Sequence, residues 1–282
     1  MKPAPFAYAR ARSVDEAVAL LGEKPDAKVL AGGQSLIATL NMRLSAPALL
    51  VDINGIGGCD GIAHKDGRVE IGALTRHVEA ERSAVVARFA PLLAKAMPHI
   101  GHPAIRNRGT IGGSIAFADP AAELPACLLA LGGDIVTRGP TGERTIKADD
   151  FFKGLFETAL GAQDVLTAIQ LPAADKDTRT GFAELTRRHG DYAIVGLAAS
   201  ATADGKGLKD VRLAYFGVGT TPVRARNAET TLAGEVNDKR IDAAVAALDL
   251  DPPDDVQATA ATKKHLAGAL LRRVVRQLME QQ

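Results

Sequence analysis

Two glycine-rich segments carry the clearest chemistry in this sequence. The first, KVLAGGQSL, covers residues 28–36 and reads as a short apolar strand, a glycine pair and a helix capped by Ser35. The second, GTIGGS, covers residues 109–114. Glycine lets a ligand lie close to the backbone, and the amides at the start of a helix attract anions. We expect the two loops to close together on one diphosphate-containing cofactor.

The two loops differ from the common nucleotide-binding motifs. The first has neither the G-x-G-x-x-G spacing of a dinucleotide fingerprint nor the lysine of a Walker loop, and a glycine pair alone is often only a tight connection. The second adds the hydroxyls of Thr110 and Ser114 and the unobstructed amides of Gly112 and Gly113. This repeated chemistry favours a diphosphate site over a purely structural turn.

Charged residues around the second loop indicate what else the cofactor carries. Asp119 and Glu123 would repel a phosphate but can accept hydrogen bonds from ribose or ribityl hydroxyls, unless Glu123 only favours the start of its helix. Arg106 and Arg108 flank the loop and either neutralise phosphate or are solvated. The carboxylates therefore suit the sugar part of such a cofactor.

The remaining histidines and cysteines indicate no second reactive centre. His99 and His102 are separated by helix-breaking residues with no carboxylate close by in the sequence, so they do not predict a metal site. Cys59 and Cys127 are too few for an iron–sulfur cluster and are expected to be small packing residues. The isolated histidines are expected at the surface, and they are His64, His77, His189 and His265.

Two further segments have roles that the sequence leaves open. Residues 216–222, FGVGTTP, form a glycine-rich run that is either a structural turn or a contact to the cofactor or to a neighbouring subunit. Residues 187–192, RRHGDY, interrupt the strand pattern with polar residues. The aromatic ring of Tyr192 either stacks on a ring system or seals a junction between domains.

The composition is that of an ordinary globular protein. The chain has 282 residues, of which 46% are hydrophobic and 24% charged, and its net charge of +1 gives no reason to expect a nucleic-acid partner. This length favours two or three compact lobes over one core. No apolar run approaches the ~20 residues of a membrane span, and the N-terminus lacks a signal-peptide core, so we expect a cytoplasmic protein.

The elements that position the loops follow from the hydrophobic periodicity. Ser13 and Glu16 form a capping-box pattern before a helix that ends near Gly22. The other elements expected before residue 172 are strands at 28–30, 48–53 and 164–171, hairpins at 62–74 and 133–147, and helices at 77–97 and 121–131. An irregular stretch at 101–126 interrupts them, and a long loop in a compact domain is often functional. The order predicts a mixed α+β domain.

The second part of the chain predicts a smaller unit. Residues 173–178 are short, charged and unpatterned, which is typical of a linker. The elements expected beyond them are strands at 181–187, 193–202 and 211–218 and helices at 239–248 and 261–279. They predict a small sheet covered by helices on one face.

Four segments, taken in order, resemble one protein family. They are AGGQSL at 31–36, IGHPAIRNRGTIGGSIAFADPAAELPA at 100–126, RRHGDYAIVGLA at 187–198 and FGVGTTPVRA at 216–225. Together they resemble the FAD-binding medium subunit of the molybdenum hydroxylases, the xanthine dehydrogenase and aerobic carbon monoxide dehydrogenase group. The resemblance implies an FAD-binding domain of two α+β subdomains (PCMH-type) at 1–173, split near 55–60. A smaller C-terminal α+β domain with an antiparallel sheet follows at 179–282.

The resemblance also implies which residues hold the FAD. The pyrophosphate would be held by Ala31, Gly32, Gly33, Gln34 and Ser35 in the first loop and by Thr110, Ile111, Gly112, Gly113 and Ser114 in the second, and Leu36 would also bind the cofactor. Asp119 and Glu123 would bind sugar or ribityl hydroxyls, and Ile100 and Gly101 would border the cofactor. Leu166 would lie near the isoalloxazine, with Tyr192 beside or over that ring.

Two positions depart from the pattern of the relatives. Glu184 stands where relatives often carry a lysine, which puts a cationic contact to the flavin in doubt. In the wider superfamily a histidine in the first loop can bond the flavin covalently, and here that position is Gln34. The resemblance therefore implies non-covalent FAD.

The implied function is that of an oxidoreductase subunit. A large subunit would hold molybdopterin, and a small subunit with two 2Fe-2S clusters would pass electrons to this FAD for delivery to an external acceptor, in a dimer of heterotrimers. Two other classes stay open. A stand-alone FAD oxidase or dehydrogenase would be reduced directly by a small substrate, whereas a non-catalytic nucleotide-binding module would remain colourless with FAD.

Overall fold

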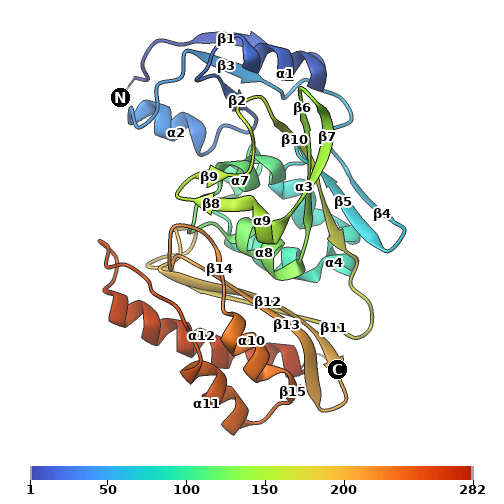
Figure 1. Ribbon diagram of the computed structural model, residues 1–282, viewed down its shortest axis with the longest axis vertical. Coiled ribbons are helices and arrows are strands. Elements are labelled where there is room, and N and C mark those ends of the chain that lie inside the picture. Colours follow the sequence, from blue (N-terminus) through green and yellow to red (C-terminus); the bar gives the residue numbers. More distant parts are fainter. Residues whose placement is uncertain (1, 281–282) are drawn as a thin grey trace.

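The computed structural model describes residues 2–280 as layers of sheet and helix stacked along one axis (Figure 1). A three-stranded sheet lies at one end, a five-stranded sheet lies in the middle, and a second five-stranded sheet lies near the other end. This mixture of separate sheets and helices confirms the α+β class that the sequence predicts.

The first sheet is parallel and carries the first glycine loop. Its order is β1–β3–β2, with strands β1 (Ala7–Arg10), β2 (Lys28–Leu30) and β3 (Leu49–Asp52). Ser13 caps α1 (Val14–Gly22) as predicted, because its hydroxyl accepts a hydrogen bond from the Glu16 amide at 3.1 Å. Ser35 before α2 (Leu36–Asn41) has helical dihedrals, φ −100° and ψ −49°, instead of the extended backbone of a side-chain cap. The expected Ser35 cap is therefore wrong.

The second sheet is antiparallel, with the order β4–β5–β10–β6–β7. Its strands are β4 (Ile62–Lys65), β5 (Arg68–Gly72), β6 (Asp134–Gly139), β7 (Gly142–Lys147) and β10 (Val165–Pro172). Both predicted hairpins form. After β7 come α9 (Ala148–Phe151) and a small hairpin made of β8 (Phe152–Gly154) and β9 (Glu157–Thr158).

The single helix predicted at 77–97 is wrong. The segment forms α3 (His77–Arg82), α4 (Ala84–Phe89), α5 (Pro91–Ala96) and a 3-10 turn at Met97–His99. Ser83 is extended, at φ −74° and ψ 121°, and its hydroxyl accepts a hydrogen bond from the Val86 amide. Pro91 starts α5 because it lacks the N–H that a continuing helix would need. The breaks let apolar residues of all three short helices, among them Ala80, Val86 and Leu92, pack in one core.

The segment predicted as irregular contains two helices, α6 (Pro103–Arg106) and α7 (Ile111–Phe117). The helix predicted at 121–131 forms as α8 (Glu123–Leu131). The second glycine loop is the beginning of α7. Helix α8 is buried along its whole length except at Leu131, which explains why it shows almost no polar face in the sequence.

The third sheet is antiparallel and follows the connection at residues 173–177. Its strands are β11 (Thr178–Leu185), β12 (Val195–Asp204), β13 (Gly207–Phe216), β14 (Val223–Arg224) and β15 (Gly234–Glu235). Its helices are α10 (Arg226–Leu232), α11 (Asp238–Ala246) and α12 (Ala260–Glu280). Helix α12 covers one face, but α8 packs on β12 and β13 from the other side. The expectation of one covered face is therefore incomplete, since the chain itself covers both.

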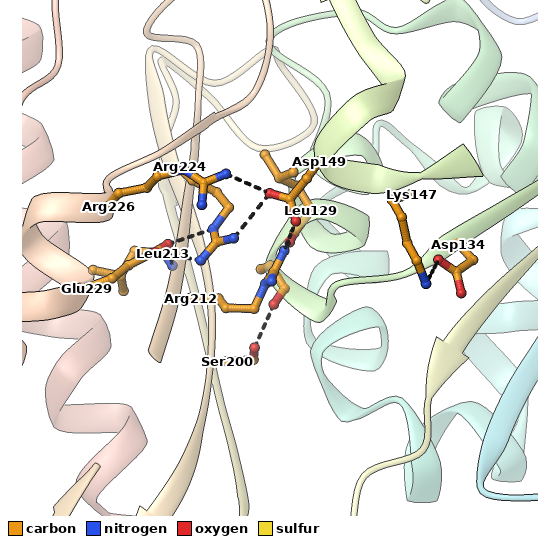
Figure 2. Close-up of polar contacts among 11 residues, drawn as sticks. Leu129, Asp134, Lys147, Asp149, Ser200, Arg212, Leu213, Arg224, Arg226 and Glu229 are labelled. Atoms are coloured by element: carbon orange, nitrogen blue, oxygen red, sulfur yellow. Dashed lines mark hydrogen bonds and ion pairs between the residues drawn. The ribbon is translucent and has the colours of Figure 1, made fainter. Parts of the chain in front are cut away.

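An ion cluster around Asp149 joins the residues before and after the connection (Figure 2). Its carboxylate accepts hydrogen bonds from Arg212 at 2.7 Å and from Arg224 and Arg226 at 3.1 Å each. Arg224 also pairs with Glu229 at 2.6 Å. Burial would raise the pKa of Asp149, but the hydrogen bonds from Arg212 and Arg224 outweigh it and lower that pKa. The carboxylate therefore stays charged at neutral pH.

Replacing Asp149 by alanine is expected to lower the free energy of unfolding by about 1–3 kcal/mol. The change removes a shared acceptor from three arginines, and the Arg224 side chain is only 11% exposed. Urea unfolding followed by circular dichroism measures the loss. The matched control is Asp150→Ala, which removes an exposed carboxylate from the same helix. Equal stability of the two variants would contradict the cluster's role.

Candidate cofactor site

The structure brings the two glycine loops into contact. A Cβ atom added to Gly32 would overlap the carbonyl oxygen of Arg108 and lie 3.0 Å from the Cα of Gly109. A Cβ atom added to Gly113 would lie 3.9 Å from the Cβ of Ala31. The first loop therefore needs a residue without a side chain at position 32, where the backbones of the two loops meet.

The first loop presents a row of unused hydrogen-bond donors. Within residues 2–280, the backbone amides of residues 32–35 donate to no protein acceptor. Gly32 is buried and residues 33–35 are half-buried, and Gly33 bends the chain with a φ of +73°. Backbone amides withdrawn from water are nearly always paired in folded proteins. A consecutive row of them therefore suits an anionic ligand.

The second loop differs from the prediction, because its amides already have partners. The amides of Ile111 and Gly112 donate to the carbonyls of Thr75 and Ala73 at 3.0 and 2.8 Å. Those of Gly113 and Ser114 donate to the hydroxyl and the carbonyl of Thr110, each at 3.1 Å. The expectation that the Gly112 and Gly113 amides are unobstructed is therefore wrong. This loop offers the half-buried hydroxyl of Ser114 and a closely packed surface, whereas the buried hydroxyl of Thr110 caps α7.

His77 is buried beneath the second loop, which corrects the expectation that it lies at the surface. It is 5% exposed, and its Nε2 lies 2.9 Å from the carbonyl oxygen of Thr110. Burial lowers the pKa of His77 to about 4, so the ring is neutral at physiological pH and Nε2–H donates this hydrogen bond. The backbone amide of His77 also donates to Gly109 at 2.9 Å. His77 thus holds the backbone of the second loop at Gly109 and Thr110.

Three acidic residues, Asp119, Glu123 and Glu184, lie close to one another in buried or half-buried positions. Glu123 is 8% exposed at the start of α8, and burial raises its pKa to about 7, with the nearby charge of Glu184 adding to the effect. Glu184 pairs with His99 at 3.2 Å, and this hydrogen bond raises the pKa of His99. Burial also raises the pKa of Asp119. The group can accept hydrogen bonds while carrying less negative charge than its composition suggests.

Two family models match the chain. The FAD binding domain in molybdopterin dehydrogenase matches residues 4–174, which is more than half of the chain, and the CO dehydrogenase flavoprotein C-terminal domain matches residues 180–278. The chain belongs to the molybdopterin dehydrogenase FAD-binding family.

Named relatives match the chain over nearly its full length. The chain is 39% identical, over 98% of its length and 95% of the relative, to the 6-hydroxypseudooxynicotine dehydrogenase complex subunit alpha of Paenarthrobacter nicotinovorans. It is 37% identical to the carbon monoxide dehydrogenase medium chain of Hydrogenophaga pseudoflava, over 98% of this chain and 97% of the relative. The solved carbon monoxide dehydrogenase from that organism superposes with a TM-score of 0.97, covering 100% of this chain and 99% of the other. The chain is an FAD-binding medium subunit of the molybdenum hydroxylase type, which confirms the resemblance.

Further segments of this FAD-binding subunit gather next to the loops. Burial and the nearby charge of Asp119 raise the pKa of Tyr192 to about 12, and a Cβ atom on Gly190 would lie 3.1 Å from the carbonyl oxygen of Gly101. The amide of Gly217, in the third glycine-rich run, donates to Pro120 at 2.9 Å. Both segments that the sequence left open therefore pack against the loop that carries Asp119.

The other predicted residues are distributed between this surface and the core. Ile111 is 0% exposed, and the side chains of Ile100 and Leu166 are also buried, so these three contribute mainly to packing within the chain. Arg106 is buried and binds Glu81 at 2.9 Å, which differs from both the phosphate-binding and the solvated interpretation. Within residues 2–280, no helix has the length and apolar content needed to cross a membrane.

Proposed function

We propose that this chain binds FAD between the two glycine loops and carries electrons from iron–sulfur clusters of a partner subunit to an external acceptor. The observation that carries the proposal is the row of unpaired amides at residues 32–35, beside the close contact of Gly32 with the backbone of Arg108. These donors fit the two negative charges of a pyrophosphate. When bound, the flavin supplies the redox chemistry, and the chain positions it and sets its electrostatic surroundings.

Each part of the site has a distinct task in this proposal. The amides of Gly32, Gly33, Gln34 and Ser35 hold the pyrophosphate, with the hydroxyl of Ser114 on the other side, in a helix that Thr110 caps. Asp119 and Glu123 accept hydrogen bonds from ribose or ribityl hydroxyls. The residues that complete the cradle or border the ring are Ala31, Leu36, Ile100, Gly101, Ile111, Gly112, Gly113, Leu166 and Tyr192. Gln34 provides no imidazole for a covalent bond, so the FAD is held without one.

The partners follow from the relatives and from what this chain contains. Its relatives are subunits of dehydrogenases, and a solved structure that it matches at 34% identity is a Cu,Mo-CO dehydrogenase. Its two cysteines are both buried and are too few for a cluster. A large molybdopterin subunit and a small subunit with 2Fe-2S clusters therefore complete the enzyme, as a dimer of heterotrimers in the cytoplasm. The FAD-binding domain spans 1–173, with two subdomains that divide near 55–60, and the C-terminal domain spans 179–282.

Purified chain is expected to bind FAD and show the visible absorption of a flavoprotein. Acid precipitation should release all of the flavin into the supernatant, because the binding is non-covalent. A chain that stays colourless after incubation with FAD would contradict the proposed function. Reduction of the bound flavin by a small substrate, with no partner subunit present, would favour a stand-alone oxidase or dehydrogenase instead.

A further inference from the structure

A pair of side chains ties the two glycine loops to each other. Nδ2 of Asn54 donates to the carbonyl oxygen of Ala31 in the first loop at 2.8 Å. Oδ1 of the same side chain accepts a hydrogen bond from Nη2 of Arg76 at 2.8 Å. Nη1 of Arg76 donates to the carbonyl oxygen of Arg108, next to the second loop, at 2.5 Å. Asn54 and Arg76 thus form one continuous bridge between Ala31 and Arg108.

The Asn54 end of the bridge is fixed by its own neighbours. Asp52 accepts hydrogen bonds from the backbone amide and the side chain of Asn54 at 2.8 and 2.7 Å. Tyr8 donates to the other oxygen of the Asp52 carboxylate at 2.6 Å. These bonds determine which way the Asn54 amide faces, because its NH₂ group must point to two acceptors, Asp52 and Ala31. Its oxygen is then left facing Arg76.

The Arg76 end of the bridge holds the backbone of Arg108, against which Gly32 of the first loop packs. The carbonyl oxygen of Arg108 that accepts its hydrogen bond is the atom that a side chain on Gly32 would overlap. The backbone of Arg76 is anchored as well, since its amide donates to Glu79 at 2.8 Å and it pairs with Thr110 as an isolated bridge. A shift of the guanidinium would therefore move the contact between the loops.

We propose that Asn54 and Arg76 are positioning residues that set the spacing of the two loops and, through it, the affinity of the chain for a diphosphate group. The inference rests on the proposed function. The four amides can donate to one anion only while the first loop keeps its position. Loops that are free to separate lose conformational entropy when the anion binds, and this loss weakens the binding. Arg76 is also a half-buried cation beside the second loop, which adds to the attraction for an anion.

The test compares Arg76→Gln, Asn54→Ala and the double variant in the full chain stripped of flavin. FAD binding is measured by quenching of flavin fluorescence, and ADP binding is measured by competition with FAD. Each single variant is expected to bind both ligands about 10- to 100-fold more weakly, because each breaks a charged or half-buried hydrogen-bonded link. The losses in the double variant should be clearly smaller than the product of the single losses, since both residues act through one bridge.

Arg179→Gln is the matched control. Arg179 also donates to two backbone carbonyls, those of Lys176 and Thr178 at 2.9 and 3.2 Å, but it lies at the connection before β11. Its substitution should leave both affinities unchanged. If Arg76→Gln does not give the native circular dichroism spectrum, Asn54→Ala decides the comparison.

Three results would overturn the positioning role. One is a folded variant that binds FAD and ADP as tightly as the unmodified chain. Another is a loss for FAD that ADP does not share, which would place the effect away from the diphosphate. The third is a loss of affinity in the double variant that equals the product of the two single losses. Failure of the unmodified chain itself to bind FAD would be a failure of the proposed function, and it is recognised separately because it precedes any substitution.

Discussion

Replacing Gly32 by alanine is expected to weaken FAD binding by about 10- to 100-fold. The added methyl group would overlap the carbonyl oxygen of Arg108, which is a backbone atom held by the Arg76 guanidinium at 2.5 Å. Neither atom can rotate away, so the two loops must separate. Overpacking of this kind costs about 1–3 kcal/mol, and here the displacement falls on the loop whose amides are unpaired. Titration of the flavin-free chain with FAD measures the effect.

The control for this experiment is Gly57→Ala. Gly57 follows the same parallel sheet, but a Cβ atom there would meet no atom of residues 2–280 within 4 Å. Its substitution should leave the FAD affinity within a factor of about two, because an open surface position tolerates a methyl group. Both variants should be compared at a temperature where each gives a native spectrum. Wild-type affinity in a folded Gly32→Ala variant would show that the contact between the loops does not frame the pyrophosphate.

Replacing Glu123 by glutamine is expected to change the pH dependence of stability and to weaken FAD binding. Burial raises the pKa of Glu123 to about 7 from the ordinary value of 4.5. Between these two values the folded chain retains a proton that the unfolded chain releases, so stability falls as the pH rises. The total loss from this group reaches about 3 kcal/mol above pH 7. The variant carries no charge there and should be more stable than the wild-type apo-protein.

Urea unfolding of both apo-proteins across pH 5–8 measures this difference. The wild-type curve should decline over the range while the variant curve stays flatter, and FAD affinity of the variant should fall about 10-fold because one acceptor oxygen becomes a donor. Glu143→Gln is the matched control, since Glu143 is exposed on β7. Parallel pH profiles for Glu123→Gln and wild type would show that the buried carboxyl does not titrate in this range.

Local patterns in the sequence were sufficient for most elements and for the choice of the two glycine loops that the structure brings together. Both hairpins, the Ser13 cap and the connection between β10 and β11 were predicted because turns, caps and linkers depend on neighbouring residues. The long helix at 77–97 was wrong for a physical reason. Ser83 and Pro91 break the helix, so that its apolar residues pack on strands that are distant in the sequence. The residue types alone favour one continuous helix. Strand β1 and helix α10 were missed, since neither has a strong periodic pattern.

The sequence by itself indicated that two glycine loops with a neighbouring acidic pair form a candidate diphosphate site, because glycine beside a helix start is a local pattern, and the family resemblance implied that the cofactor is FAD. Only the tertiary structure decided which of the two loops has unpaired amides for a ligand. The amides of the first loop are unpaired, whereas those of the second are used by residues 73–75 and Thr110. Asn54, Arg76 and His77 were not identified as parts of the site, because each acts on a carbonyl that is distant in sequence. Hydrogen bonds of this kind depend on which segments fold against each other, and no local pattern encodes them.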